Sequence, residues 1–176
     1  MRRIGVVSIV FALGLVAVAL AVAATNRTWS THANGAQEFP VRDTQGQGQA
    51  IFKLAKDGTS IDYKLIASNI ENVFMVHIHL AQGPGTNGGI VVWLYPSTAE
   101  NVRAPVGGGR TDGVLVTGTF GAGDLVGALR GQPLSALVAA LNAGTAYVNY
   151  HTDDGAAPAN TGPGDFPGGE IRGDIR

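Results

Sequence analysis

Cysteine is absent from the chain, and charged residues are few. Without cysteine, a disulfide framework, a thiolate metal site and a cysteine nucleophile are all excluded. Lysine and arginine number 12 against 13 acidic residues, so the basic surplus of a nucleic-acid-binding protein is missing and no nucleic-acid partner is expected. Charged residues make up 14% and hydrophobic residues 45%, and there are 26 glycines, a balance typical of a turn-rich globular domain.

The first 24 residues have the three-part pattern of a secretory signal peptide. Arg2 and Arg3 precede an apolar stretch that ends in Ala21-Val22-Ala23, a small-residue sequence after which cleavage is expected. The same stretch is long enough to remain as an uncleaved N-terminal membrane anchor. Both interpretations predict one domain over 25–176, secreted or held at the cell envelope, with membrane contact only through the first segment if it is retained.

Alternation of apolar and polar residues predicts strands at 50–55 and 61–66. The Asp57-Gly58 turn between them favours an antiparallel hairpin. We expect the opening strand, from Trp29 onward, and a strand at 71–80 to extend this hairpin as a meander. Further strands are expected at 90–95, 114–119, 146–151 and 169–176.

A change to helical spacing predicts one short helix at about 134–142, with a second helical turn at 123–129. The apolar stripe of this helix is expected to cap the open end of the sheet structure. About eight short antiparallel strands with so little helix predict an all-β fold, a β-sandwich or a flattened barrel.

Two of the four histidines lie at alternate positions of the strand predicted at 71–80. His77 and His79 therefore point to one face, where two neutral nitrogens suit copper or zinc. If the strand that carries His151 is a neighbour, three histidines form a metal site with an open coordination position. The alternative is that hydrogen bonds from the imidazoles hold one end of the fold together. His32 is either a fourth ligand or a surface residue near the mature terminus.

Polar residues near these histidines have two possible roles. Asp153 and Asp154 are candidates to orient the imidazoles, or are simply solvated. Asn149 shares the face of His151 and is a candidate for a structural or ligand-orienting role. Glu170, Arg172 and Asp174 alternate on the last strand, a pattern that predicts either a charge ladder on the solvent face or an anion site at Arg172. We expect Glu170 and Arg172 to be structural.

Five sequence blocks stand in order along the chain: ANGAQEFP (33–40), AIF (50–52) with the Asp57-Gly58 turn, VHIH (76–79) with GPGTNG (83–88), YVNYHT (147–152) and PGGEIRG (167–173). Together they resemble the CHRD domain family, which is named after chordin and occurs in microbes as single-domain secreted proteins. The resemblance covers about residues 30–176 and implies an extracellular immunoglobulin-like β-sandwich. A fainter resemblance to copper/zinc superoxide dismutases, which are Greek-key sandwiches, rests on the His-x-His strand; the bridging histidine, later zinc ligands and disulfide of those enzymes have no counterpart.

The resemblance and the lack of a complete catalytic constellation favour a non-enzymatic secreted module. Its expected partner is an extracellular protein or a component of the cell surface or matrix, and no cofactor is required. The competing hypothesis is a copper- or zinc-binding metalloprotein, with or without redox activity, that uses His77, His79 and His151.

Overall fold

The computed structural model describes residues 27–83 and 85–176. The predicted leader at 1–24 lies outside this part of the chain. Within it, no helix has the length and apolar character needed to cross a membrane.

The described chain contains eight strands, one α-helix and three short 3₁₀ segments. The helical elements are η1 (Gly35–Gln37), η2 (Ala122–Asp124), η3 (Gly127–Leu129) and α1 (Leu134–Asn142). The strands are β1 (Thr28–Asn34), β2 (Gln47–Leu54), β3 (Ser60–Glu71), β4 (Val73–Leu80), β5 (Ile90–Tyr95), β6 (Arg110–Gly121), β7 (Ala146–Thr152) and β8 (Ile171–Asp174). The predicted strands and the helix at 134–142 are therefore confirmed.

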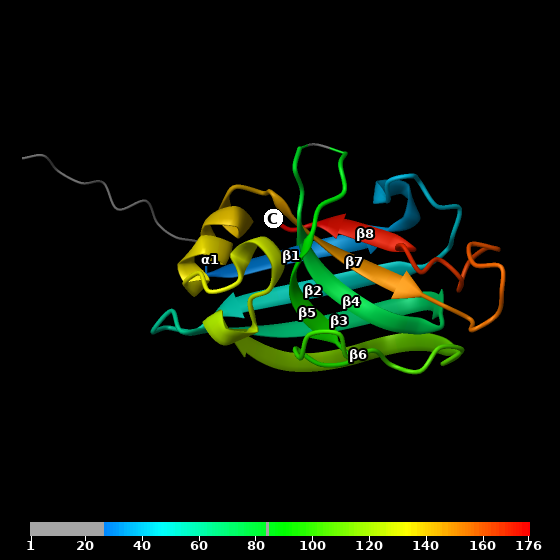
Figure 1. Cartoon of the computed structure of the whole chain (residues 1–176), viewed down its shortest axis with the longest axis horizontal. Coiled ribbons are helices and arrows are strands. Elements are labelled where there is room, and N and C mark those ends of the chain that lie inside the picture. The colour runs from blue at the N-terminus through cyan, green and yellow to red at the C-terminus, as the bar shows by residue number, and fades with distance from the viewer. Residues whose placement is uncertain (1–26, 84) are drawn as a thin grey trace, which may run out of the picture.

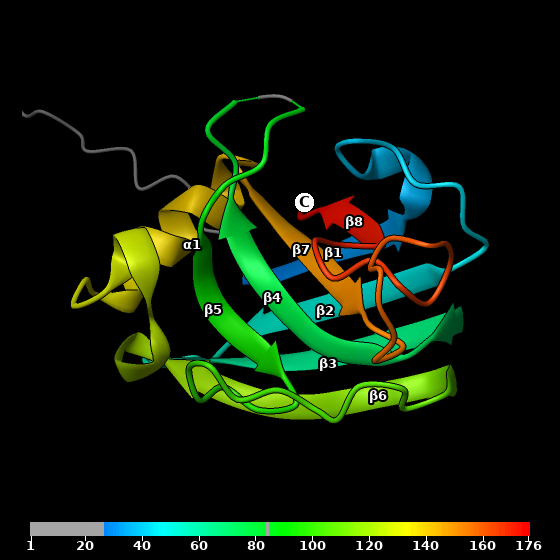
Figure 2. The same ribbon diagram turned by 45° about the vertical axis from the view of Figure 1, so that its right-hand side comes forward.

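All eight strands belong to one antiparallel sheet in the order β5-β4-β7-β8-β1-β2-β3-β6. The sheet curls until β4, β5 and β7 lie across from β1, β2 and β3, which gives a nearly barrel-shaped domain (Figures 1 and 2). The flattened barrel expected from the strand pattern is the closer description. The immunoglobulin-like Greek-key sandwich is not confirmed.

The predicted meander is correct for β1, β2 and β3 and wrong for β4. The outer edge of β3 pairs with β6, and β4 pairs with β5 and β7 instead. Strands β3 and β6 are each 12 residues long, whereas β4 has 8. The long edge of β3 is thus matched in length by β6, a pairing of distant segments that local pattern does not reveal.

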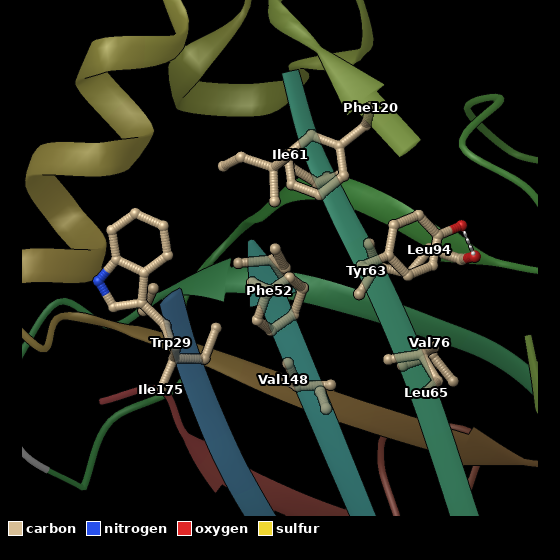
Figure 3. Packing of buried hydrophobic residues seen from close by; sticks show 14 of the residues in the cluster. Trp29, Phe52, Ile61, Tyr63, Leu65, Val76, Leu94, Phe120, Val148 and Ile175 are labelled. Carbon is tan, nitrogen blue, oxygen red and sulfur yellow. Dashed lines mark hydrogen bonds between the residues drawn. The ribbon is translucent and has the colours of Figure 1, made fainter. Parts of the chain in front are cut away.

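Apolar side chains from both halves of the curled sheet meet in one core (Figure 3). The helix α1 closes one end of this core with four buried side chains, as its apolar stripe predicts. Trp29, at the same end, donates from Nε1 to Asn142 Oδ1 at 3.1 Å, so the indole nitrogen is satisfied although the ring is buried. The four helix residues are Leu134, Leu137, Val138 and Leu141.

Two tyrosines brace the halves of the sheet against each other through the core. The Tyr63 hydroxyl on β3 donates to the Leu94 carbonyl on β5 at 2.7 Å (Figure 3). The Tyr150 hydroxyl on β7 lies 3.1 Å from the Gln49 carbonyl on β2 and 3.3 Å from the Ile66 carbonyl on β3. Each hydroxyl thus satisfies a buried polar group and fixes the spacing between opposite walls.

Each bracing ring lies against a glycine. A Cβ at Gly48 would come within 2.9 Å of the Tyr150 ring, and one at Gly118 would come within 2.6 Å of the Tyr63 hydroxyl. Both rings occupy the space that a side chain on the facing backbone would otherwise take. Glycine is required at these positions for close approach rather than for an unusual backbone angle.

The side of β4 and β7 that faces away from this core is also buried. We call it the outer face; it carries His77 and His79 on β4 and Tyr147, Asn149 and His151 on β7. Nearly every residue of both strands is buried, whichever side it points to. Three segments contact the outer-face side chains: 35–46, the loop 81–89, and 164–170. The outer face is therefore a second interior, covered by loops rather than by a sheet.

Candidate metal centre

The three predicted histidines lie together on the outer face. Strands β4 and β7 are hydrogen-bonded neighbours, which is the condition that the sequence left open for His151. The register sets Met75 opposite His151, His77 opposite Asn149, and His79 opposite Tyr147. One nitrogen from each of the three imidazoles lies within 4.8 Å of the others. The strand alternation that predicted one shared face for His77 and His79 thus brings all three rings into contact.

The hydrogen bonds of two rings determine which of their nitrogens carries the proton. His79 Nδ1 lies 2.9 Å from the Gly88 carbonyl, and His151 Nδ1 lies 2.9 Å from the Pro167 carbonyl. A carbonyl only accepts, so both Nδ1 atoms donate and both Nε2 atoms are left with a free lone pair. Backbone carbonyls commonly orient metal-binding histidines in this way.

The third ring, His77, completes the cluster. Its Nδ1 lies 3.2 Å from His151 Nε2, to which it donates when no metal is present. Within residues 27–83 and 85–176, His77 Nε2 and His79 Nε2 are buried and have no hydrogen-bond partner. Buried polar atoms without a partner destabilise a fold, so this cluster lacks the hydrogen bonds that a purely structural role would supply.

Burial keeps the three imidazoles neutral. It lowers the pKa of His77 from 6.5 to about 2, and the nearby His151 and His79 lower it further. Burial lowers the pKa of His79 and of His151 to about 4, against smaller upward effects of the hydrogen bonds to Gly88 and Pro167. Neutral imidazole is the form that binds a metal ion, so the cluster presents ligand lone pairs at neutral pH.

Aromatic and cationic neighbours hold the rings in place. Trp93 packs edge-on against His77 with 4.1 Å between ring centroids, and Tyr147 stacks on His79 at 4.9 Å. The Arg172 guanidinium covers the other side of Tyr147, 3.6 Å from the ring centroid. Because it packs against these side chains, the His79 imidazole has little freedom to rotate.

Gly88 links two members of the cluster to the covering loop. Its N–H donates to the Tyr147 hydroxyl at 2.9 Å, and its carbonyl accepts from His79. A Cβ at this position would lie 1.5 Å from the Leu80 carbonyl oxygen, so only glycine fits. The loop 81–89 thus brings both the N–H and the carbonyl of Gly88 against the outer face.

Glu170 and Arg172 are buried, contrary to the predicted ladder on the solvent face, whereas Asp174 is only partly buried. Glu170 is fully buried and accepts from Thr44 Oγ1 at 2.5 Å, Thr152 Oγ1 at 2.6 Å and the Gly164 N–H at 2.8 Å. Arg172, also buried, donates to the Thr86 carbonyl at 3.0 Å. The prediction failed because loops distant in sequence cover this face. The contacts fit the expected structural role, since both side chains tie loops to the sheet.

Asn149 leads to a residue that the sequence did not single out. Its amide donates to Glu38 Oε1 at 3.0 Å, while Asn149 Oδ1 and Glu38 Oε2 are buried without a partner among the described residues. Burial raises the pKa of Glu38, and the bond from Asn149 and the charges of Arg172 and Arg42 only partly oppose it. Glu38 belongs to the block at 33–40, where the resemblance to CHRD domains was the only available signal.

For two sets of neighbours of the histidines the sequence left alternatives open, and the structure excludes the ligand-related alternative in each case. Asp153 and Asp154 do not orient the imidazoles, because backbone carbonyls of Gly88 and Pro167 take that role. His32 is exposed on β1 and does not join the three-histidine group. A pocket of about 460 Å³ opens beside His151, with Met75, Arg103 and Pro167 among its lining residues.

Fold and site together define an all-β, antiparallel domain with a loop-covered histidine cluster outside its apolar core. Residues 29–175 match the model of the CHRD domain family, nearly the whole described chain, and the protein belongs to that family. CHRD domains are typically extracellular modules. Searches of curated proteins and of solved structures gave no significant match.

Proposed function

We propose that this CHRD domain is an extracytoplasmic module that binds one transition-metal ion, copper or zinc, through His77, His79 and His151. The observation that carries the proposal is the convergence of three neutral, buried imidazoles, of which His77 and His79 each keep an Nε2 atom without a partner among the described residues. All three ligands are nitrogens, which suits copper and zinc, and copper is expected to bind more tightly.

The spacing of the nitrogens supports a shared ion. Two nitrogens, each about 2.05 Å from a tetrahedral ion, are about 3.3 Å apart. His77 Nδ1 and His151 Nε2 are separated by 3.2 Å, and one nitrogen from each of the three rings lies within 4.8 Å of the others. An ion held by His77 Nδ1 and His151 Nε2 would replace the hydrogen bond between these two rings, and His77 would then carry its proton on Nε2. Three protein ligands leave one position open to water or a further ligand.

The location and the partner expected from the sequence fit this proposal. A leader at 1–24 delivers the domain to a compartment where copper and zinc are exchanged between proteins, and the site does not conflict with an extracellular protein or matrix partner. The proposal requires no turnover, so the module is a binding protein in the first instance.

The test is a titration of the purified, chelator-treated protein with Cu²⁺ and with Zn²⁺, followed by calorimetry. We expect near-stoichiometric binding that the double variant His77→Ala/His79→Ala abolishes and that His32→Ala, which removes an exposed histidine of β1, leaves unchanged. Circular dichroism of each variant establishes that it is folded. Equal binding by the folded double variant and the wild type would refute the proposed site.

A further inference from the structure

A second group of potential ligands lies in the long loop between β7 and β8. Asp153, Asp154 and Asp165 each place one carboxylate oxygen within 4.8 Å of the other two. None of the three is in an ion pair among the described residues. Three carboxylates at this spacing repel one another unless a cation lies between them.

Asp165 gives an independent indication that a ligand belongs here. Its side chain is only 2% exposed, yet Oδ1 has no hydrogen-bond partner anywhere in 27–83 and 85–176. The other oxygen, Oδ2, accepts from the N–H and the hydroxyl of Thr161, both at 2.9 Å. One buried carboxylate oxygen of the acidic group is thus left without a donor, and a cation would provide the missing interaction.

The other two aspartates also keep an oxygen free. Asp153 Oδ1 accepts from the Gly155 N–H and Asp154 Oδ1 accepts from the Ala156 N–H, each at 2.8 Å. These bonds fix both side chains while leaving their second oxygens available. The group contains only hard oxygen ligands, which exclude a preference for copper or zinc and favour calcium or magnesium.

We propose that Asp153, Asp154 and Asp165 bind a calcium ion. An irregular loop that supplies carboxylate and carbonyl oxygens suits the flexible coordination of calcium better than the strict octahedron of magnesium. Extracellular modules hold calcium with dissociation constants of about 10⁻⁴ to 10⁻³ M, and we expect a value in this range. The inference does not depend on the histidine site, with which it shares no ligand.

The calcium site is connected to the outer face through adjacent residues. Phe166 donates from its N–H to Thr152 Oγ1 at 3.0 Å, and the next residue, Pro167, supplies the carbonyl that orients His151. Fixing Asp165 therefore fixes the segment that covers His151. Calcium is expected to raise the thermal stability of the protein, with the logarithm of the free calcium concentration once that concentration exceeds the dissociation constant.

The test is calorimetric titration of the chelator-treated full chain with CaCl₂ and, separately, with MgCl₂. We expect one calcium per chain and at least about tenfold weaker binding by Asp165→Asn, because carboxylate charge sets affinity in such sites. The matched control is Asp43→Asn, which removes the same charge from an exposed position in the segment 35–46. It should bind as the wild type does.

Asp154→Asn is a second test variant, which complements Asp165→Asn because Asp154 is exposed and its loss leaves the core untouched. It should weaken calcium binding while circular dichroism stays unchanged. The variant His77→Ala/His79→Ala should retain calcium binding, which separates this site from the histidine cluster. No saturable calcium binding by the wild type, unchanged binding by both aspartate variants, or equal affinity for magnesium would each overturn the proposal.

Discussion

The inner and outer faces of strands β4 and β7 are buried to the same degree and are stabilised by different means. On the inner face, Ile78 and Val148 pack into the apolar core, and the Tyr150 hydroxyl has two carbonyl partners. On the outer face, His77, His79 and Asn149 each retain a buried atom without a partner in the described chain. Burial alone therefore does not distinguish a core from a candidate site, whereas buried polar atoms without a hydrogen-bond partner do.

Acidification is expected to have the largest effect, and to act through the outer face alone. The folded protein keeps its histidines neutral down to about pH 4, whereas in the unfolded chain they take up protons near pH 6.5. The unfolded state thus binds more protons between these values, so stability is complete above about pH 6.5 and is lost as pH falls. Each unit of depression corresponds to about 1.4 kcal/mol per imidazole.

Urea unfolding of the metal-free protein across this range measures the effect, with acid unfolding expected between about pH 4 and about pH 6. Bound zinc should move the transition to lower pH, because the ion competes with protons for the same nitrogens. His32→Ala, which removes an exposed histidine, should not alter the profile. A stability that is flat from pH 7 to pH 4.5 would contradict the assignment of neutral buried histidines.

The next largest effects are expected from substitution of Ile78 and His77, which are adjacent on β4 and lie on opposite faces. Ile78→Ala removes a fully buried side chain from the inner face and should lower the free energy of unfolding by about 2–5 kcal/mol. Metal stoichiometry should be unchanged in the protein that remains folded. His77→Ala should abolish metal binding at a smaller cost in metal-free stability, since it also removes an unpartnered nitrogen.

Chemical denaturation and metal titration of the two variants give the comparison directly. The distinction between the faces fails if Ile78→Ala loses the metal while folded, or if His77→Ala keeps it.

Tyr147→Phe tests the loop that covers the outer face. It removes the hydroxyl that accepts from the Gly88 N–H, and with it the support of the carbonyl that orients His79. We expect a loss of about 1 kcal/mol in stability and a tenfold or greater loss in metal affinity, as for other residues that orient metal ligands. The matched control is Tyr95→Phe, since Tyr95 is a half-buried tyrosine on β5. Equal effects of both substitutions on metal affinity would exclude this role for Gly88.

Glu38→Gln is expected to have the smallest effect, and to raise the stability of the fold where the other substitutions lower it. Burial raises the pKa of Glu38, so its contribution to stability is complete at low pH and declines as pH rises through the raised value. The amide avoids that decline, and the variant should be up to about 1 kcal/mol more stable near pH 8. Unfolding from about pH 4.5, the ordinary pKa of the carboxyl, to about pH 8, with the exposed Glu71→Gln as control, measures it. A destabilised variant would show that the charge pairing with Arg172 outweighs burial.

Local pattern was sufficient for the parts of the fold and site that lie within one strand or one turn. The Asp57-Gly58 turn predicted the β2–β3 hairpin, and helical spacing predicted α1 at Leu134–Asn142. Alternation also placed His77 and His79 on one side of β4, because side-chain direction in a strand depends only on position along the chain. These features need no knowledge of distant segments.

The predictions from sequence that failed concern contacts between distant segments. Glu170 and Arg172 carry charges that indicate an exposed face, yet loops from residues 35–46 and 81–89 cover them. Glu38 reaches Asn149 across 111 positions of sequence. Likewise β6 displaces β4 from the edge of β3. Each outcome is set by which segment covers which face, and alternation carries no information on that choice.

The two tyrosine braces have a consequence for how this sequence can change over evolution. Because the Tyr150 ring occupies the space above Gly48, and the Tyr63 hydroxyl the space above Gly118, neither glycine can be enlarged while its tyrosine remains. A larger residue at 48 or 118 requires a smaller one at the facing position. Related sequences should therefore show Gly48 varying together with Tyr150, and Gly118 with Tyr63, as two linked pairs that drift independently of the histidines.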